Sequence, residues 1–251
     1  MKLPLIFDIK RASTADGPGL RTVVFFKGCS LDCFWCHNPE GKSSFAQLAH
    51  FKDKCTACGT CRRVCTHEGA CVLCGACTEA CPTEARRLYG APYDAEELMT
   101  ILLADKPYFD ACGGGVTFSG GECMLYPEAI TYLARRCREE GIAVAIDTAG
   151  NVPFSSFEQV LPFVDLFLYD VKALDPALHQ RGTGVTNERI LANLDALRER
   201  GAKLLVRIPV IPDFNAGEEV ASIRRYCEER SLPYEELAYH DFGASKQDAL
   251  L

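Results

Sequence analysis

The sequence predicts an α/β fold with a parallel sheet, interrupted once by a small cysteine-rich insertion. Six β-rich runs occur along the chain, and helical patterns alternate with them from residue 94 onward. Strands that alternate with helices form parallel βαβ units. Six units are fewer than the eight of a closed barrel, so we expect an open, partial (β/α)6 barrel. Eight cysteines within residues 55–81 mark the insertion.

The first expected strand is residues 21–27, because β-branched and aromatic side chains dominate Arg21-Thr-Val-Val-Phe-Phe-Lys27. A helix is expected over residues 94–106, where apolar side chains have helical spacing behind an aspartate start signal. The later expected strands are residues 115–119, 142–147, 165–171, 203–209 and 234–240, and the later expected helices are residues 127–140, 154–161, 187–200 and 217–230.

A chain of 251 residues is long enough for one domain of this kind plus the insertion. We expect a barrel domain formed by residues 1–50 and 88–251, and an inserted domain of residues 51–87. The formal net charge of −7 gives no basic footprint for nucleic acid. The N-terminus has too short an apolar run for a signal peptide or a membrane span. Fifteen cysteines without a secretion signal are typical of metal ligands, so we expect a reducing, cytoplasmic location.

The loop after the first strand carries three cysteines, Cys29, Cys33 and Cys36, separated by three and two residues. Electron-carrying [4Fe–4S] cubes have four cysteine ligands, and structural zinc sites begin with a closer cysteine pair followed by a second pair. Three thiolates at this spacing favour a cube with one iron left open. An open coordination position is where substrate chemistry takes place in metalloenzymes.

The insertion repeats one cysteine pattern twice. Cys-x2-Cys-x2-Cys-x3-Cys runs from residue 55 to 65 and again from 71 to 81, where Pro82 follows. This is the bacterial two-cluster ferredoxin pattern, in which the fourth cysteine of each run binds the other cluster. We therefore expect one cube on Cys55, Cys58, Cys61 and Cys81, and a second on Cys71, Cys74, Cys77 and Cys65. The alternative is a pair of zinc sites, which seldom use this doubled pattern.

Four cysteines remain outside these patterns. Cys137 and Cys227 lie in helical segments and are expected to pack as small apolar side chains. Cys112 and Cys123 flank a glycine-rich segment, so a packing role and a place in the lining of a site are both open for them.

A polar or charged side chain follows or ends almost every predicted strand. In parallel α/β folds the ligands gather at the carboxyl ends of the strands. Each such residue alone is adequately explained as a solvated loop residue, but together they indicate a site. Besides the Cys29 loop, they are Gly120, Gly121, Glu122, Asp147, Thr148, Asp170, Lys172, Arg207 and His240.

Three segments carry a more specific pattern: residues 16–21 (Asp-Gly-Pro-Gly-Leu-Arg), residues 25–40, which contain the three-cysteine loop, and residues 113–122 (Gly-Gly-Gly-Val-Thr-Phe-Ser-Gly-Gly-Glu). In this order they resemble the glycyl-radical-enzyme activating enzymes of the radical S-adenosylmethionine (SAM) superfamily, which are similar to pyruvate formate-lyase activating enzyme. The doubled cysteine run resembles the branch of that family with a ferredoxin-type insertion.

The resemblance implies a radical SAM oxidoreductase with one catalytic and two auxiliary [4Fe–4S] clusters. The open iron would hold the amino and carboxylate groups of SAM, and reduction would give methionine and a 5′-deoxyadenosyl radical. The radical would remove an α-hydrogen from a glycine of a partner protein, a glycyl radical enzyme. A flavodoxin or ferredoxin-type donor is implied as the electron source.

The resemblance also assigns roles to single residues. Trp35 and His240 would lie near the adenine, and a buried core side chain is the alternative for each. Gly120, Gly121 and Glu122 would hold the methionine end of SAM, and Asp170, Lys172 and Arg207 its polar groups. Asp147 and Thr148, with Asp170, resemble a monovalent-cation site, for which hydrogen-bonded strand ends are the alternative. Asp16 would contact the partner's loop.

Two other functions stay open at this point. One is a radical SAM enzyme with a small-molecule substrate, and the other is a ferredoxin-type electron-transfer protein. SAM binding separates the second from the activating enzyme. The sequence does not specify which glycyl radical enzyme is the partner, because the recognised motifs concern SAM.

Overall fold

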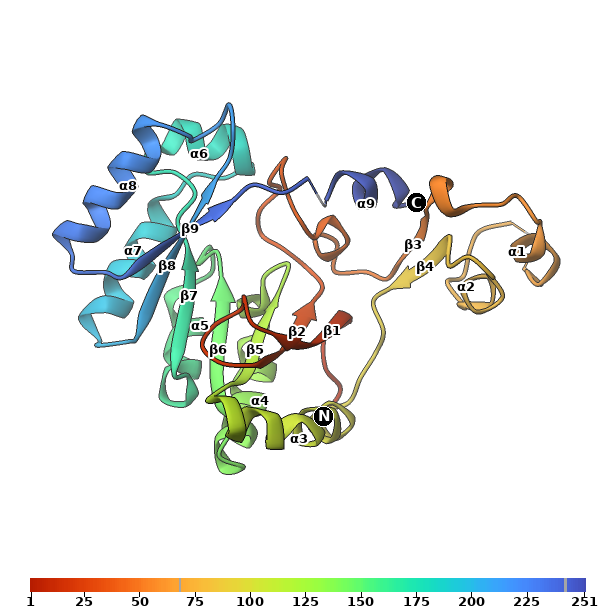
Figure 1. Ribbon diagram of the computed structural model, residues 1–251, viewed down its shortest axis with the longest axis horizontal. Coiled ribbons are helices and arrows are strands. Elements are labelled where there is room, and N and C mark those ends of the chain that lie inside the picture. The colour runs from red at the N-terminus through yellow and green to blue at the C-terminus, as the bar shows by residue number, and fades with distance from the viewer. Residues whose placement is uncertain (68, 242) are drawn as a thin grey trace.

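The computed structural model describes residues 1–67, 69–241 and 243–251, and a seven-stranded sheet forms its centre (Figure 1). Its strands are β1 (Ile6–Ser13), β2 (Arg21–Phe26), β5 (Gly115–Gly120), β6 (Ala143–Thr148), β7 (Leu166–Asp170), β8 (Leu204–Val210) and β9 (Tyr234–Ala238), in the order β1-β2-β5-β6-β7-β8-β9. β2 and β5 to β9 are all parallel, which confirms the six predicted strands and the open α/β architecture.

Strand β1 was not predicted. It pairs antiparallel with β2 at the edge of the sheet, and most of its residues from Asp8 to Ala12 are exposed or half-buried. Charged side chains are common on edge strands, where they discourage pairing with other chains. They also remove the apolar pattern by which a strand is recognised in sequence.

The helices that follow the strands are α3 (Ala95–Cys112), α4 (Pro127–Glu139), α5 (Phe154–Val160), α6 (Pro176–Thr183), α7 (Glu188–Glu199) and α8 (Glu218–Glu229). Short 3-10 turns are η1 (Pro39–Gly41), η2 (Lys52–Lys54), η3 (Cys123–Leu125) and η4 (Leu161–Phe163). Helix α3 begins with a capping box between Asp94 and Glu97, as expected, but continues through Pro107 to Cys112. Helix α6 was missed because it is a single eight-residue segment without an apolar repeat.

One face of the sheet is covered by helices and the other faces the site, because successive side chains of a strand point to opposite faces. On β6, Val144 and Ile146 belong to the main core, which also contains side chains from α3, α4, α5, α7 and α8. Asp147 points the other way. On β8, Val206 and Ile208 join the core while Arg207 lies on the opposite face. The alternation of side chains along β6 and β8 therefore places Asp147 and Arg207 on the face of the sheet that the helices leave uncovered.

The cysteine-rich segment connects β3 (Gln47–His50) with β4 (Arg86–Tyr89), and these two strands form an antiparallel pair. It contains two one-turn helices, α1 (Thr60–Arg63) and α2 (Ala76–Glu79), and Figure 1 shows it standing away from the large sheet. The last helix, α9 (Ala244–Ala249), lies between this segment and the barrel. Among the described residues, no helix has both the length and the apolar character that a membrane span needs.

Candidate functional site

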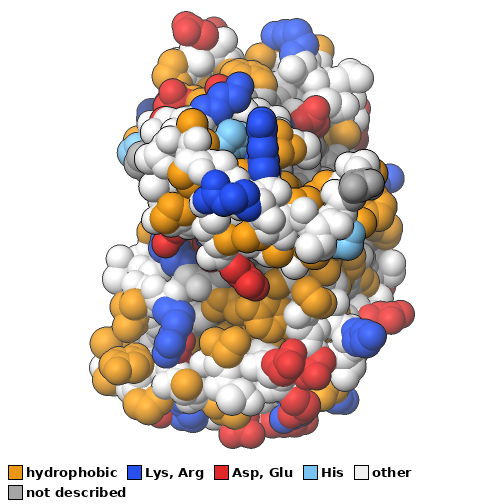
Figure 2. Space-filling view, turned by 90° about the vertical axis from the view of Figure 1, so that its right-hand side faces the viewer, with side chains coloured by type: hydrophobic (Ala, Val, Ile, Leu, Met, Phe, Trp, Pro, Cys, Tyr) orange, Lys and Arg blue, Asp and Glu red, His pale blue; other side chains and the backbone are white. Residues whose placement is uncertain are grey.

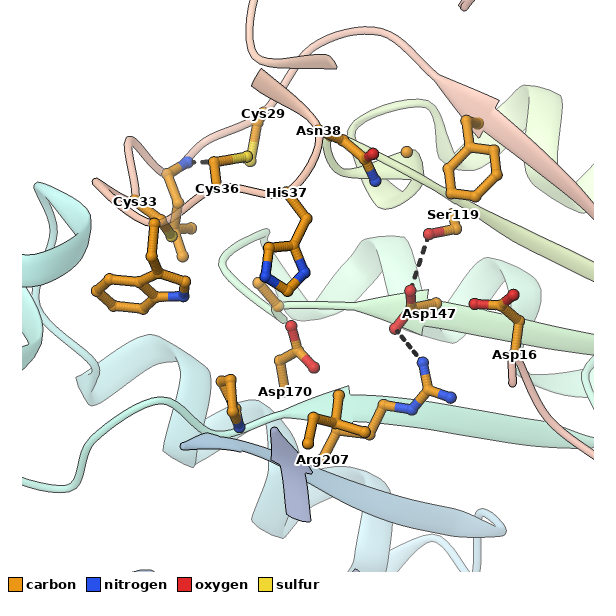
Figure 3. Close-up of a pocket in the computed structure, with 18 of the residues that line it drawn as sticks. Asp16, Cys29, Cys33, Cys36, His37, Asn38, Ser119, Asp147, Asp170 and Arg207 are labelled. Carbon is orange, nitrogen blue, oxygen red and sulfur yellow. Dashed lines mark hydrogen bonds and ion pairs between the residues drawn. The ribbon is translucent and has the colours of Figure 1, made fainter. Parts of the chain in front are cut away.

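A cavity of about 670 Å³ opens at the carboxyl ends of the parallel strands. All three cysteines of the loop after β2 line it. Figure 3 shows Cys29, Cys33 and Cys36 at one end of the cavity, and Asp16, Asp147 and Arg207 at the other. Predicted residues that also line the cavity are Trp35, Gly120, Gly121, Thr148, Asp170, Lys172 and His240. The structure therefore brings together side chains that lie far apart in the sequence.

Backbone hydrogen bonds hold the cysteine loop in a closed turn. Gly28 has a φ of 97°, in the region that favours glycine, and its N–H donates to the carbonyl of Gly41 at 2.8 Å. The N–H of Cys29 donates to the carbonyl of Lys42 at 3.0 Å. The start of the loop at Gly28 is thus hydrogen-bonded to the residues that follow it, Gly41 and Lys42. All three cysteines between these points line the cavity.

Burial raises the pKa of Cys29 to about 12 and that of Cys33 to about 11. Thiols in this environment are neutral near pH 7. Iron binding must therefore displace their protons, as it does wherever thiolates ligate metal. The group that suits these thiols is a metal cluster, because all three line one cavity at a spacing that lets each bind a different iron.

Gly120 and Gly121 are required by close backbone packing. A Cβ on Gly120 would lie 2.2 Å from the carbonyl oxygen of Phe26, and one on Gly121 would lie 2.2 Å from that of Gly28. The turn after β5 is therefore pressed against the start of the cysteine loop. The N–H of Gly121 already donates to the carbonyl of Phe26, so the two glycines fix the loop as well as lining the cavity.

Glu122 lies beneath the cavity and is absent from its lining. The side chain is 1% exposed, and its carboxylate accepts hydrogen bonds from Thr148 Oγ1 at 2.8 Å and from the N–H groups of Met124 and Ala149. It joins the glycine turn to the end of β6. The expected contact of this carboxylate with SAM has no support in this geometry, because its oxygens are engaged by protein donors.

Burial raises the pKa of Glu122 to about 7, despite the hydrogen bond from Thr148. The folded state thus holds the proton more tightly than the unfolded state, whose carboxyl has its ordinary pKa of about 4.3. We expect the contribution of Glu122 to stability to be complete below pH 4 and lost as the pH rises through 7. Urea unfolding of the parent and of Glu122→Gln, at pH 5.5 and pH 8 under anaerobic conditions, measures it. A parent that loses no more stability than the variant between these values contradicts the prediction.

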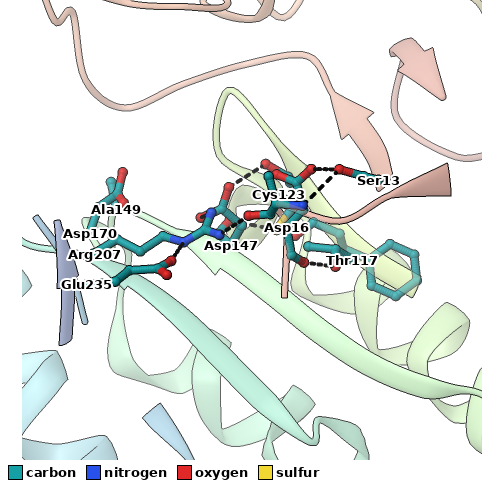
Figure 4. A network of polar contacts seen from close by, with 12 residues as sticks. Ser13, Asp16, Thr117, Cys123, Asp147, Ala149, Asp170, Arg207 and Glu235 are labelled. Carbon is teal, nitrogen blue, oxygen red and sulfur yellow. Dashed lines mark hydrogen bonds and ion pairs between the residues drawn. The ribbon is translucent and has the colours of Figure 1, made fainter. Parts of the chain in front are cut away.

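Asp147 and Arg207 form the centre of a polar network across four strands (Figure 4). Ser119 donates to Asp147 Oδ2 at 2.8 Å, and Arg207 Nη1 lies 3.7 Å from Asp147 Oδ1. Burial raises the pKa of Asp147 to about 6, although the guanidinium of Arg207 opposes this. Arg207 also donates to Glu235 and to the backbone carbonyl of Ala15, so the network ties β5, β6, β8 and β9 to the loop after β1.

Asp170 and Lys172 form an ion pair at the end of β7. Lys172 Nζ lies 2.5 Å from Asp170 Oδ2, and the lysine side chain is 9% exposed. Burial alone would lower the pKa of Lys172, but the charge of Asp170 outweighs it and raises the pKa above the ordinary value. The cation therefore stays charged inside the cavity. It also lies close enough to Cys33 to favour that residue's thiolate.

Asp16 lines the cavity at the end opposite the cysteines, as Figure 3 shows. Its carboxylate accepts a hydrogen bond from Ser13, and Lys10 Nζ lies 3.7 Å away. Arg21, 3% exposed, holds the turn after Asp16 in place by donating to the carbonyls of Pro18 and Val116. Asp16, which the sequence linked to a partner's loop, thus lies at the end of the cavity opposite the cysteines.

Trp35 satisfies both of its sequence-based interpretations. It is 8% exposed and packs against Phe214 with ring centroids 4.4 Å apart, yet it also lines the cavity. His240 is exposed on the cavity wall, with its ring centroid 6.5 Å from that of His37. This position excludes the alternative of a buried core histidine.

Of the four remaining cysteines, three pack in the core, and Cys112 has neither of the two roles that the sequence left open for it. Cys137 and Cys227 are fully buried in the main core. Cys123 is also fully buried, and its thiol donates to the carbonyl of Phe118 at 3.4 Å, which assigns it a packing role. Cys112 is exposed at the end of α3.

The two cysteine runs of the insertion have the same backbone conformation. Ala57 and Leu73, which occupy equivalent positions, both have a φ of 55°, and Gly59 and Gly75 have φ values of 73° and 81°. Left-handed conformations are costly for Ala and Leu, so their repetition indicates that the backbone is shaped around a group. Among residues 1–67, 69–241 and 243–251, no three His, Cys, Asp or Glu side chains converge on one metal ion. A cube does not require this, because each thiolate binds a different iron.

Sequence reasoning missed several residues of the cavity wall. Ser119 belongs to the glycine-rich segment and could have been found by its position directly before Gly120. His37 and Asn38 directly follow the third cysteine, which is a similar signal. Lys246, from α9, gave no signal, because nothing in the sequence connects the C-terminus with the cysteine loop.

Comparisons with known proteins agree with this geometry. Residues 23–226 match the family described as the radical SAM superfamily. The chain is 35% identical over 265 residues to the trans-4-hydroxy-L-proline dehydratase activating enzyme of Clostridioides difficile, covering 98% of this chain and 88% of that protein. It is 39% identical over 268 residues to the choline trimethylamine-lyase activating enzyme of Oleidesulfovibrio alaskensis, covering 98% and 86%.

A third relative is the benzylsuccinate synthase activating enzyme of Thauera aromatica, 38% identical over 251 residues, which cover 91% of this chain and 74% of that protein. Among solved structures, Streptococcus suis SuiB bound to precursor peptide SuiA is similar with a TM-score of 0.59. That match has 16% identity and covers 92% of this chain and 42% of SuiB, so it supports the fold alone.

Proposed function

The chain belongs to the radical SAM superfamily, among its glycyl-radical-enzyme activating enzymes, and we propose that its cavity cleaves SAM to activate a partner through one glycine. One observation carries the proposal: three thiols at the spacing of an open cluster line one cavity together with a set of paired charges. An electron carrier needs no such cavity, because its clusters only exchange electrons.

The residues of the loop fit a three-thiolate [4Fe–4S] cluster held by Cys29, Cys33 and Cys36. When bound, cluster and SAM together supply reductive cleavage of the sulfonium to methionine and a 5′-deoxyadenosyl radical. Lys172 offers a cation for the SAM carboxylate, and Asp170 and Asp147 offer acceptors for its ammonium and hydroxyl groups. Trp35, Gly120, Gly121, Thr148, Arg207 and His240 complete the wall in this proposal.

Glu122 has a positioning role in this proposal. It holds the glycine turn against the end of β6, so that both walls of the cavity keep their spacing. A monovalent cation between Asp147, Thr148 and Asp170 is a further part of the proposal. It is supported by the two half-buried carboxylates of Asp147 and Asp170 that line one cavity, because hard cations prefer oxygen ligands.

We also propose two auxiliary cubes in the insertion, with the cysteine pairing predicted from the sequence. The repeated left-handed residues at 57, 59, 73 and 75 support two equivalent cradles. The thiols of Cys55, Cys58, Cys71 and Cys74 are exposed, so cubes bound there would lie near the surface, within reach of an external donor.

Basic side chains on the insertion offer contacts to an electron donor. Residues 51–87 carry six Lys and Arg against four Asp and Glu, but two cubes held by eight thiolates would add negative charge, so these contacts are local and do not make the insertion basic as a whole. Figure 2 views the molecule from this side, and Lys and Arg side chains stand out in its upper half while Asp and Glu gather towards the bottom. A flavodoxin or ferredoxin-type donor with an acidic docking surface would be attracted to these Lys and Arg side chains, and complementary charges accelerate association.

A labelled peptide tests the reaction. The protein is reconstituted with iron and sulfide under anaerobic conditions, reduced with dithionite and mixed with SAM. A peptide containing Arg-Val-Ala-Gly-Tyr, with both glycine α-hydrogens replaced by deuterium, stands for the partner's loop. We expect 5′-deoxyadenosine that has gained one deuterium, detected by mass spectrometry, because the radical takes its hydrogen from that glycine.

Unlabelled 5′-deoxyadenosine, both with the peptide and with intact glycyl radical enzymes that are deuterated at glycine, contradicts the glycine target and favours a small-molecule substrate. No 5′-deoxyadenosine, together with no SAM binding, contradicts SAM cleavage and favours the electron-carrier function.

A further inference from the structure

The C-terminal segment, residues 239–241 and 243–251, crosses the site from one side to the other. After β9, Tyr239 and His240 line the cavity, and helix α9 follows (Figure 1). The segment ends on β3, where the N–H of Leu251 donates to the carbonyl of Leu48 at 2.9 Å and Leu250 bridges Ala49. It therefore connects the last strand of the barrel with the base of the insertion.

One side chain of this segment contacts the residues after the third cysteine. Lys246 Nζ donates to the carbonyl of His37 at 3.1 Å, to Asn38 Oδ1 at 3.1 Å and to Glu40 Oε1 at 2.7 Å. An ammonium group has three donors, and all three are used here. Two of the contacted residues, His37 and Asn38, are walls of the cavity.

The backbone of the segment also lies on the cysteine loop. A Cβ on Gly243 would lie 1.9 Å from the carbonyl oxygen of Cys36, so only glycine fits there. Further on, Ala249 packs in a small core with Phe7 and Tyr89. The segment is thus anchored beyond Lys246 and is in direct contact with the third cluster cysteine before it.

Glu40 explains why a cation is needed at this place. Its side chain is 4% exposed, and Oε2 has no hydrogen-bond partner among the described residues. The nearby ammonium of Lys27 donates to the backbone carbonyl of Glu40 and to Gln47 instead of the carboxylate. A buried carboxylate that loses its cation is strongly unfavourable, so Lys246 fixes the Cys36–Glu40 turn through charge as well as hydrogen bonds.

We propose that Lys246 is a positioning residue for SAM: from the C-terminal segment it holds His37 and Asn38 in the geometry that completes the cofactor cavity. The proposal rests on the proposed function, because it names SAM as the occupant of that cavity. It assigns to the C-terminus a role that no motif of the chain indicates.

The test uses the full-length protein, anaerobically reconstituted, as parent, Lys246→Met and Gln247→Met. Gln247 is exposed on the same helix, so its replacement by Met is a matched control. SAM affinity is measured by equilibrium dialysis, iron per chain by a colorimetric assay, and the reduced cluster by EPR before and after SAM is added. We expect Lys246→Met to weaken SAM binding by about tenfold or more, since hydrogen bonds from a charged donor are lost.

The iron content of Lys246→Met should equal that of the parent, and its EPR spectrum should respond to SAM only at higher SAM concentration. The Gln247→Met control should behave as the parent does. The double variant Glu40→Gln/Lys246→Met removes the unpaired charge but still leaves His37 and Asn38 without their donor. We expect it to keep most of the defect in SAM binding.

Unchanged SAM affinity in Lys246→Met overturns the proposal. Full recovery in the double variant also overturns it, because Lys246 would then act only by neutralising Glu40. Loss of iron with unchanged affinity per loaded cluster indicates a purely structural role and overturns it too. A parent that binds no SAM overturns the proposed function itself, which separates that failure from the others.

Discussion

Replacing Cys29, Cys33 and Cys36 together by Ala should abolish 5′-deoxyadenosine formation from SAM. The three thiols line one cavity and are the ligands of the proposed open cluster. Without them no iron is held beside the paired charges of the cavity, whereas the insertion keeps its own eight cysteines. The measurement is 5′-deoxyadenosine by mass spectrometry after anaerobic reduction with dithionite.

The same variant tests the auxiliary clusters. With three cubes the parent should contain about twelve irons per chain, and the variant about eight, because each cube has four. Cys112→Ala is the matched control, since this exposed cysteine belongs to no cluster pattern. About four irons in the parent and none in the variant would exclude the two auxiliary cubes, and an active variant would exclude the assigned catalytic ligands.

The parallel sheet was predictable because its strands carry local signals. β-branched and aromatic runs mark β2 and β5 to β8, and alternation along them separates core residues such as Ile146 from site residues such as Asp147. The rule that ligands gather at carboxyl strand ends then brings Asp147, Asp170 and Arg207 together without any tertiary information. These residues were identified from sequence for that reason.

Glu122 shows the limit of such reasoning. Glu122 follows the end of β5, much as Asp147 and Asp170 lie at or next to the ends of their strands. Its side chain nevertheless points beneath the cavity, where it accepts a hydrogen bond from Thr148. The direction of the Glu122 side chain is set by η3, the turn of Cys123–Leu125. The carboxylate of Glu122 accepts a hydrogen bond from the N–H of Met124 in this turn. Sequence spacing places a residue in a loop but does not determine to which side of the loop its side chain points.

Lys246 shows a different limit. Its partners lie more than two hundred positions earlier in the chain, on His37, Asn38 and Glu40. Helix α9 has six residues, and neither strong apolar periodicity nor a side-chain cap marks it. Contacts of this kind follow from the packing of the whole chain, so local patterns carry no trace of them.

Lys172→Met should reduce SAM cleavage by about a hundredfold, as expected when one partner of a buried, hydrogen-bonded charge pair is truncated. The variant leaves Asp170 without its cation, in a cavity that already contains Asp147. The unpaired carboxylate of Asp170 repels that of Asp147 and raises the pKa of Asp147 further above its value of about 6, although Arg207 still faces Asp147. Both the positive charge offered to SAM and the ordered arrangement of the acceptors are lost.

The double variant Asp170→Asn/Lys172→Met separates these two effects. If the loss comes mainly from the unpaired carboxylate, removing its charge restores much of the activity. If Lys172 itself binds the SAM carboxylate, the double variant stays as inactive as the single one, and this is the result we expect. The measurements are the rate of 5′-deoxyadenosine formation and SAM affinity by equilibrium dialysis, with Lys203→Met, a change outside the cavity lining, as the control. Activity of Lys172→Met within a few-fold of the parent would remove this ion pair from the catalytic machinery.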